Sequence, residues 1–222
     1  MAIISYKHNL IIVRPPKTGS SSFHLSVVDS GILGEDDIYS GLNLMRNQGY
    51  VPTKGIYRHN TPQMLLDKKH ITEEQLRSFK ILTTIRQPIS RYISAFFFST
   101  KLRRKPNNLK TFKRLINKPN TAKRFVNSLG PCQSAYFKVD GKYLTNMLVV
   151  PTPKINECAK HLIDKYNGKY VEHDLKSDIK PEWAKPHYTE WLDQTHIDIL
   201  EDILQKENEE YQYVMTNNQY KI

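Results

Sequence analysis

The sequence has no long hydrophobic run. Its apolar stretches are short, as in Leu10–Val13, whereas a membrane-spanning helix needs roughly 18 or more apolar residues and a signal peptide needs a core of about 7–15. We therefore expect no signal peptide and no stable membrane insertion, and we expect a soluble, cytoplasmic protein.

Cysteine is also scarce, with only Cys132 and Cys158 in 222 residues. They lack the C-x-x-C spacing of a zinc site, so we expect no structural metal. Two reduced thiols in a reducing compartment are favoured over one disulfide, although the spacing leaves their pairing open. A chain of this length buries a sufficient core without such staples, and we expect one domain over residues 1–222.

Negative charge is in deficit, because 33 lysines and arginines face 22 carboxylates and leave a net charge of +11. This favours anionic partners, among which a nucleotide, an acidic glycan, a nucleic acid and a membrane surface all stay open, as does a role in solubility alone. A nucleic-acid binder would concentrate its cations with aromatics on one element. Here they are spread along the chain, with a short cluster at Lys101–Lys105, so we expect no nucleic-acid partner.

Two segments have the pattern of a buried strand followed by a helix. Leu10–Val13 precedes a small-residue loop and a helix at Phe23–Val28, and Phe79–Ile85 precedes a helix at Ile89–Thr100. Strands that alternate with helices predict an α/β fold with a central, mostly parallel sheet. Further expected elements are helices at 109–116, 120–129, 155–166 and 195–213, and a short strand at 169–171.

The loop Pro16–Ser22 has the composition of an anion site. A helix N-terminus offers unpaired N–H groups and a favourable dipole, Gly19 permits close backbone approach, and the serines and Lys17 add donors. Lysine precedes glycine, so the loop does not match the Walker A pattern of nucleotide triphosphatases. By itself it is also compatible with an ordinary strand–helix turn.

A second polar segment begins where Phe79–Ile85 ends. Arg86 follows the strand directly, and Ser90 and Ser94 share one face of the helix expected after Pro88. Ligands of open parallel sheets bind beyond the carboxyl ends of the strands, so this segment and the loop could grip two phosphates of one ligand. The alternative makes Arg86 and Arg91 surface or salt-bridging residues.

Together the two segments resemble those of sulfotransferases that use 3′-phosphoadenosine 5′-phosphosulfate (PAPS). Pro16–Ser22 looks like their 5′-phosphosulfate-binding loop. Ile85–Phe96 is similar to their 3′-phosphate-binding segment, R-[DN]-P-x-x-R-x-x-S-x-[YF], with Gln87 at the Asp or Asn position. The likeness is closest to the carbohydrate branch, particularly the heparan and uronosyl 2-O-sulfotransferases. Further similar segments are Gly55–His59, Gln133–Tyr136 and Tyr170–Ser177.

This resemblance implies a three-layer, P-loop-like fold and a sulfotransferase activity that leaves 3′,5′-adenosine bisphosphate (PAP) as product. Lys17 would stabilise the departing bridging oxygen, and no metal would be required. Arg86 and Ser94 would hold the 3′-phosphate. The 5′-phosphosulfate would be held by the rest of the loop, which is Thr18, Gly19, Ser20, Ser21 and Ser22.

The acceptor is expected to be a hydroxyl, with a carbohydrate as the leading class. Its proton needs a base, for which His59 is the first candidate and a carboxylate in Glu35–Asp37 the second. His173 is a weaker candidate contact to the acceptor. Two other functions stay open, a nucleotide kinase-like phosphotransferase and a non-enzymatic nucleic-acid binder, and the sequence leaves the oligomeric state undetermined.

Overall fold

The computed structural model describes residues 2–39, 59–102, 108–128, 130–173, 184 and 187–217. The chain consists of two compact units. The first unit comprises the residues up to Ile85 together with 133–173, and the second comprises 86–132 and 174–217. The expected single domain over residues 1–222 stays a prediction.

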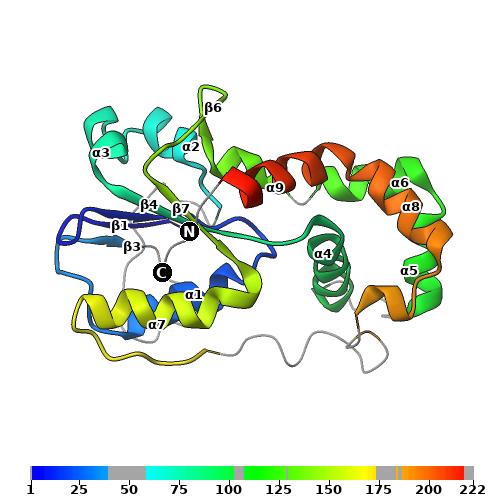
Figure 1. Cartoon of the computed structure of the whole chain (residues 1–222), viewed down its shortest axis with the longest axis horizontal. Coiled ribbons are helices and arrows are strands. Elements are labelled where there is room, and N and C mark those ends of the chain that lie inside the picture. Colours follow the sequence, from blue (N-terminus) through cyan, green and yellow to red (C-terminus); the bar gives the residue numbers. More distant parts are fainter. Residues whose placement is uncertain are drawn as a thin grey trace. The chain divides into compact units, whose positions relative to one another are not determined.

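The first unit is built on a five-stranded sheet (Figure 1) with the strand order β3-β1-β2-β4-β7. β2 pairs parallel with β4 and β4 with β7, whereas β1 is antiparallel to both β2 and β3. Four strands therefore point the same way, with β1 reversed. The strands are β1 (Ile3–Ser5), β2 (Leu10–Ile12), β3 (Ile38–Tyr39), β4 (Lys80–Ile85) and β7 (Met147–Pro151).

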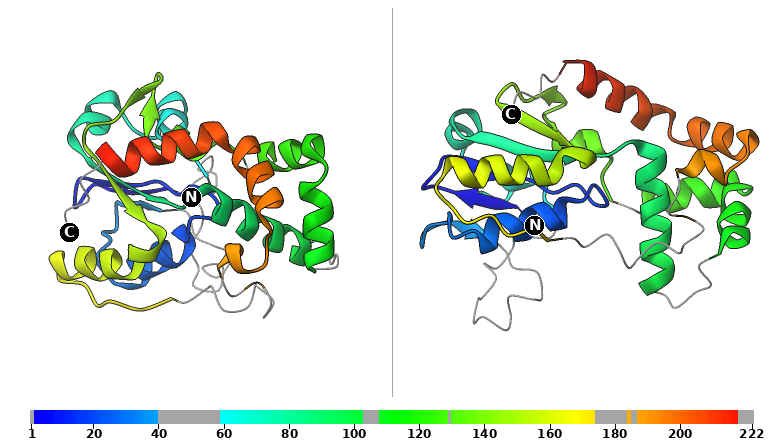
Figure 2. Two further views of the ribbon diagram at one scale, coloured as in Figure 1. Left: turned by 45° about the vertical axis from the view of Figure 1, so that its right-hand side comes forward. Right: turned by 60° about the horizontal axis from the view of Figure 1, so that its bottom comes forward.

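Helices cover both faces of this sheet. α1 (Ser20–Asp29) and α7 (Ile155–Lys165) pack side by side below it, and α2 (Pro62–Asp67) and α3 (Glu73–Ser78) lie above it (Figures 1 and 2). Alternate strand residues point to the α1–α7 face, where they form a buried core that includes Leu10, Ile12, Leu82 and Val150 from the strands and Phe23, Val27, Cys158 and Ile163 from the helices. The expected α/β fold with a mostly parallel sheet flanked by helices is confirmed.

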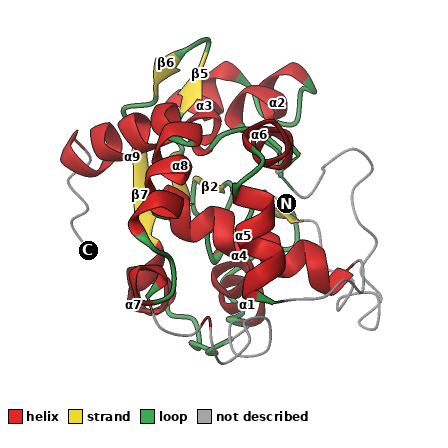
Figure 3. Cartoon of the chain, turned by 90° about the vertical axis from the view of Figure 1, so that its right-hand side faces the viewer, coloured by secondary structure: helices red, strands yellow, loops and turns green. Residues whose placement is uncertain are grey.

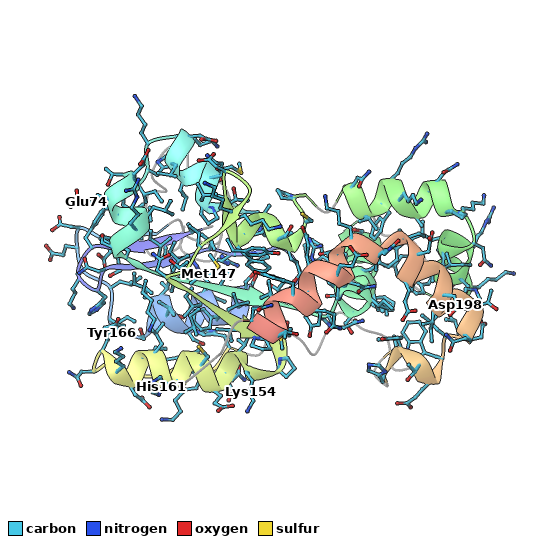
Figure 4. The ribbon with its side chains drawn as sticks, turned by 45° about the horizontal axis from the view of Figure 1, so that its top comes forward. Glu74, Met147, Lys154, His161, Tyr166 and Asp198 are labelled. Carbon is cyan, nitrogen blue, oxygen red and sulfur yellow. The ribbon has the colours of Figure 1, made fainter. Side chains whose placement is uncertain are left out.

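Smaller elements complete the first unit. A 3₁₀ turn, η2 (Gln133–Tyr136), leads into a hairpin of β5 (Lys138–Val139) and β6 (Lys142–Tyr143). Met147 then begins β7, whose end is followed by a second 3₁₀ turn, η3 (Thr152–Lys154), and by α7. Figure 4 marks the exposed face of α7 at His161.

The second unit is helical in the part that the structure describes (Figure 3). Its core joins Phe96 and Phe97 to Phe112, Leu200 and Leu204, all of them buried. The elements are α4 (Pro88–Leu102), α5 (Leu109–Ile116), α6 (Pro119–Asn127), η5 (Tyr188–Glu190), α8 (Gln194–Ile203) and α9 (Gln205–Asn217).

Two expected elements differ from the structure. The single helix expected over 195–213 is interrupted at Leu204, where the backbone leaves the helical region and the side chain is buried. No glycine or proline marks this break, and the apolar periodicity continues through it. The sequence pattern therefore predicts one continuous helix. Residues 169–171 form no strand, because the Lys169 amide donates to the Ser30 carbonyl outside the sheet.

Candidate functional site

The loop between β2 and α1 has the backbone of an anion-binding turn. Lys17 and Gly19 both adopt left-handed conformations, with φ of +67° and +77°. Gly19 is the N-cap of α1, and no side chain caps this helix end. The first turn of α1 also contains no acidic residue. Left-handed turns that lead into a helix N-terminus direct backbone N–H groups at one point, which suits an oxyanion.

Gly19 is required by its surroundings as well as by its φ. A Cβ placed on it would lie 2.6 Å from Cδ1 of Ile155, the first residue of α7. A Cβ at position 19 would therefore require the terminal methyl group of Ile155 or the loop to shift. The conformation and the packing both explain why glycine stands here.

Two of the loop hydroxyls hold the loop itself together. Thr18 Oγ1 and Ser20 Oγ both donate to the Pro15 carbonyl, at 2.9 and 3.0 Å. Because the one proton of Thr18 is used in this way, Thr84 of β4 is the donor in the 2.5 Å bond between the two threonine hydroxyls. These bonds fix the loop over the end of β4. The sequence placed Thr18 and Ser20 at a ligand, and that assignment stays a prediction.

Lys17 and Ser21 are the loop side chains that remain half-buried rather than enclosed. Ser21 Oγ accepts a 2.8 Å bond from the Arg14 guanidinium, which leaves its own proton able to donate. Ser22 is buried, and its amide bonds to the Gly19 carbonyl at 3.2 Å. Lys17, Ser21 and the backbone of the helix terminus are therefore the groups best placed to contact an anion.

Arg14 is a residue that sequence reasoning missed. It follows β2 and is only 3% exposed, and its guanidinium adds positive charge behind the loop. Its carbonyl accepts a 2.9 Å bond from Nδ1 of His59. A charged residue between a buried strand and two prolines was the available signal. The contacts to Ser21 and to His59 connect the helix terminus to a residue 45 positions away in the chain.

His59 lies next to this loop, held at both its ring and its backbone. Because a carbonyl only accepts, Nδ1 must carry the proton, so Nε2 is the basic nitrogen of the neutral ring. The His59 carbonyl accepts a 3.0 Å bond from the Tyr136 hydroxyl of η2. The ring is exposed. Residues 55–58 of the segment singled out with His59 lie outside the described residues.

The alternative base is a carboxylate in Glu35–Asp37, of which Asp37 is engaged in hydrogen bonds. Asp37 is buried and accepts bonds from the Ser5 hydroxyl and from the amides of Gly34 and Lys7. Burial works to raise its pKa, but these hydrogen bonds lower it below the ordinary value. Asp37 therefore ties β1 to the following loop. Glu35 and Asp36 are exposed.

His173 lies at the other end of α1. Its Nε2 is 2.8 Å from the carboxylate of Asp29, the last residue of that helix. This contact places His173 at the C-terminal end of α1, while the candidate anion site is at the N-terminal end. Ser177, in the segment singled out with it, lies outside the described residues.

The second phosphate segment belongs to the second unit. Arg86 directly follows β4, and burial lowers the pKa of its guanidinium to about 10, so the side chain stays charged at neutral pH. Gln87 Oε1 accepts a 2.7 Å bond from the Ser90 amide and so caps α4, which is the role that Asp or Asn would serve there. Ser90 and Ser94 are half-buried, one turn apart on α4. The gripping of one ligand by both segments stays a prediction.

Arg91 has the salt-bridging role that the sequence left open. Its guanidinium lies 2.6 Å from the Glu207 carboxylate, with 2% and 8% of the two side chains exposed. The pair joins α4 to α9. Of the aromatic cluster on α4, Phe96 and Phe97 are buried, whereas Phe98 is 39% exposed.

A basic surface lies on α5 and just after it. Residues 75–139 contain fifteen lysines and arginines and no aspartate or glutamate. Lys110 and Arg114 are exposed one helical turn apart on α5, and Lys118 is exposed just after it, while Phe112 and Ile116 are buried. A hollow of about 610 Å³ is lined by Leu109, Lys110, Lys113, Arg114, Asn117 and Lys118. Of the cluster noted at Lys101–Lys105, Arg103, Arg104 and Lys105 lie outside the described residues.

Neither a cluster of metal ligands nor a membrane-spanning helix is found among the described residues. Over that part of the chain, no three His, Cys, Asp or Glu side chains come together as metal ligands. Over the same residues, every helix is too short or too polar to cross a bilayer.

The comparisons with known proteins give one result. No family model matches this chain, and no curated protein matches it. Among solved structures, the chain is similar to a sulfotransferase from Alicyclobacillus acidocaldarius, with 14% sequence identity and a TM-score of 0.41. The match covers 92% of this chain and 85% of that chain. A likeness of this size does not show the function of this chain.

Proposed function

We propose that this chain is a sulfotransferase that uses PAPS to sulfate a hydroxyl group, with a carbohydrate as the acceptor class. The observation that carries the proposal is the β2–α1 loop. It combines left-handed Lys17 and Gly19 with an uncapped helix N-terminus, and Arg14 links it to His59. Anion donors and a candidate base therefore lie within one compact unit.

The residues present fit a phosphosulfate. An oxyanion needs several N–H or O–H donors and a compensating positive charge. The N-terminus of α1 and Ser21 supply donors, and Lys17 and the buried Arg14 supply charge. The left-handed conformation of Gly19 turns the loop into the helix N-terminus. PAPS would bring the activated sulfuryl group, and Arg86 with Ser94 would hold its 3′-phosphate.

The protein's own groups would act by positioning and by charge. Lys17 would neutralise negative charge that develops on the bridging oxygen, as cationic side chains do in phosphoryl transfer. His59 would accept the acceptor's proton at Nε2, because Nδ1 is already committed to the Arg14 carbonyl. The hydrogen bond from the Tyr136 hydroxyl to the His59 carbonyl would hold the His59 backbone, and with it the ring, in place. Asp37 is a weaker base, because its lowered pKa reflects engagement with three donors.

The charge distribution bears on the acceptor. Lys113 of α5 pairs with Asp193 at 3.0 Å. Lys110, Arg114 and Lys118 are exposed in a stretch of the sequence, residues 75–139, that contains no aspartate or glutamate, and such a basic surface favours a negatively charged partner. We therefore propose an acceptor sugar chain that itself bears negative charge. Phe112 and Ile116 of α5 are buried, so these two apolar side chains are not available to a membrane surface.

A thermal shift experiment separates the three functional classes. The protein is heated with PAP, with ATP or with single-stranded DNA, each across a concentration series. Binding to the folded state raises the melting temperature. PAP should therefore raise it, whereas ATP and single-stranded DNA should not. Equal stabilisation by ATP would favour a kinase-like enzyme, and stabilisation by DNA alone would favour a nucleic-acid binder. No shift with PAP would refute the proposal.

A further inference from the structure

Thr152 occupies a junction that no sequence pattern marked. It is the first residue after β7 and begins η3. Its hydroxyl oxygen lies 3.0 Å from the Thr18 carbonyl oxygen and 2.9 Å from the Ile85 carbonyl oxygen. These two partners stand 134 and 67 positions away in the chain. One side chain therefore touches the loop after β2 and the end of β4 together.

The chemistry of this contact is restrictive. A threonine hydroxyl has one proton, and a carbonyl oxygen only accepts. The two carbonyls must therefore share or alternate for the same proton, which draws both toward a single point. A valine at this position would have nearly the same shape, but it would leave both carbonyls without that donor.

Both carbonyls belong to segments that matter for the candidate site. Thr18 lies between the two left-handed residues of the anion loop, Lys17 and Gly19. Ile85 is the last residue of β4 and is bonded directly to Arg86. The Thr152 hydroxyl therefore restrains the backbone at Thr18, inside the anion loop, and at Ile85, directly before Arg86. Both the loop and Arg86 are expected to bind phosphates.

Two neighbouring contacts also restrain the anion loop. Thr84 of β4 bonds through its hydroxyl to Thr18 Oγ1, and Ile155 of α7 fills the space beside the Cα of Gly19. The loop is therefore held by β4 on one side and by the β7–α7 junction on the other. These contacts restrain the loop without using Lys17 or Ser21.

We propose that Thr152 is a positioning residue, which sets the backbone of the anion loop and of the β4 end so that both meet one doubly phosphorylated ligand. The inference deepens the proposed function and rests on it for the identity of that ligand. Thr152 acts through Thr18 and Ile85 and needs no contact with the reacting atoms. Preorganisation of this kind strengthens binding, because less conformational freedom is lost when the ligand arrives.

The test replaces Thr152 and measures PAP affinity by isothermal titration on the full chain. Thr152→Val should weaken PAP binding by roughly three- to tenfold, the range expected for one lost hydrogen bond. Thr152→Ser keeps the hydroxyl and should stay within about twofold of the parent protein. If the valine variant does not fold, Thr152→Cys replaces it, since a thiol is only a weak donor.

Thr83→Val is the matched control. Thr83 lies on β4 next to Thr84 and is fully buried, and its hydroxyl has no hydrogen-bond partner among the described residues. The same chemical change at this position should leave PAP affinity unaltered. An equal loss of affinity in Thr83→Val and Thr152→Val would show a general effect of the sheet and would overturn the proposal.

A second readout keeps this test separate from the proposed function. Amide hydrogen exchange of residues 17–22 is measured without ligand in the parent protein and in both valine variants. Faster exchange in Thr152→Val but not in Thr83→Val supports the positioning role, even if the parent protein binds no PAP and the proposed function fails. Unchanged exchange together with unchanged affinity in Thr152→Val would overturn it.

Discussion

The ion pair between Arg91 and Glu207 predicts a large and specific loss of stability. Both side chains are almost completely buried, and their charged atoms are 2.6 Å apart. Arg91→Met would leave the Glu207 carboxylate buried without this partner. Removing one member of a buried pair typically costs about 3–5 kcal/mol of unfolding free energy, because the remaining charge loses its compensation without regaining water.

The expected change is large enough to measure directly. For a chain of this size, each kcal/mol lowers the melting temperature by roughly 2–4 °C, so Arg91→Met should melt on the order of 6–20 °C below the parent protein. Glu207→Leu should fall in the same range. The double variant should lose clearly less than the sum of the two, since an apolar pair of similar volume often replaces a buried ion pair with little cost.

Chemical denaturation of the four proteins completes this double-mutant cycle. A coupling free energy of about 2 kcal/mol or more would confirm that the pair acts as one buried unit between α4 and α9. Two observations would refute the reasoning. One is a cost below about 1 kcal/mol for either single variant, as for a surface pair. The other is strict additivity in the double variant.

Three further predictions concern the loop and helix of the candidate site. Lys17→Ala should abolish sulfuryl transfer while the melting temperature stays close to that of the parent protein; an active variant in a transfer assay would refute its role. Gly19→Ala should lower the unfolding free energy by about 1–2 kcal/mol, since it forces alanine into a left-handed conformation and against Ile155; unchanged stability in denaturation would contradict this packing. Burial, with the nearby Arg14 charge, holds the pKa of His24 well below its ordinary value of 6.5, so the unfolded chain binds a proton that the folded chain does not. The contribution of His24 to the unfolding free energy should be full above pH 7 and should fall below about pH 6.5, by at most ~1.4 kcal/mol per pH unit. When the unfolding free energy is measured by denaturation across this pH range, His24→Leu should show a smaller dependence on pH than the parent protein. An identical dependence would rule out the contribution.

The sequence predicted the parts of the fold whose signals are local. The β-branched runs at Leu10–Val13 and Phe79–Ile85 correspond to β2 and β4, and the small-residue loop begins α1 as expected. β7 was missed, although it is a neighbour of β4 in the sheet. Its run Leu148–Val150 is short and ends in proline, so no periodicity distinguishes it from a loop.

In the candidate site, too, the residues with local sequence signals were predicted and the others were not. The loop residues and His59 were singled out from composition and motif, and the structure joins His59 to the loop through the Arg14 carbonyl. Arg14 and Thr152 were not found, because their importance comes from partners distant in sequence. Thr152 meets Thr18 across 134 positions, and no local pattern contains that contact. The break at Leu204 was missed because no glycine or proline marks it; the residue at which α8 ends is a buried leucine.

The most direct measurement is the affinity of the parent protein, Lys17→Ala and Arg86→Ala for PAP by isothermal titration. The parent protein should bind one PAP per chain, and each variant should weaken binding by at least about tenfold, because each loses a charged contact to one of the two phosphates. Both variants should keep the melting temperature of the parent protein within a few degrees. Absence of PAP binding by the parent protein, or unchanged affinity in either variant, would contradict the two-phosphate grip on which the proposed function depends.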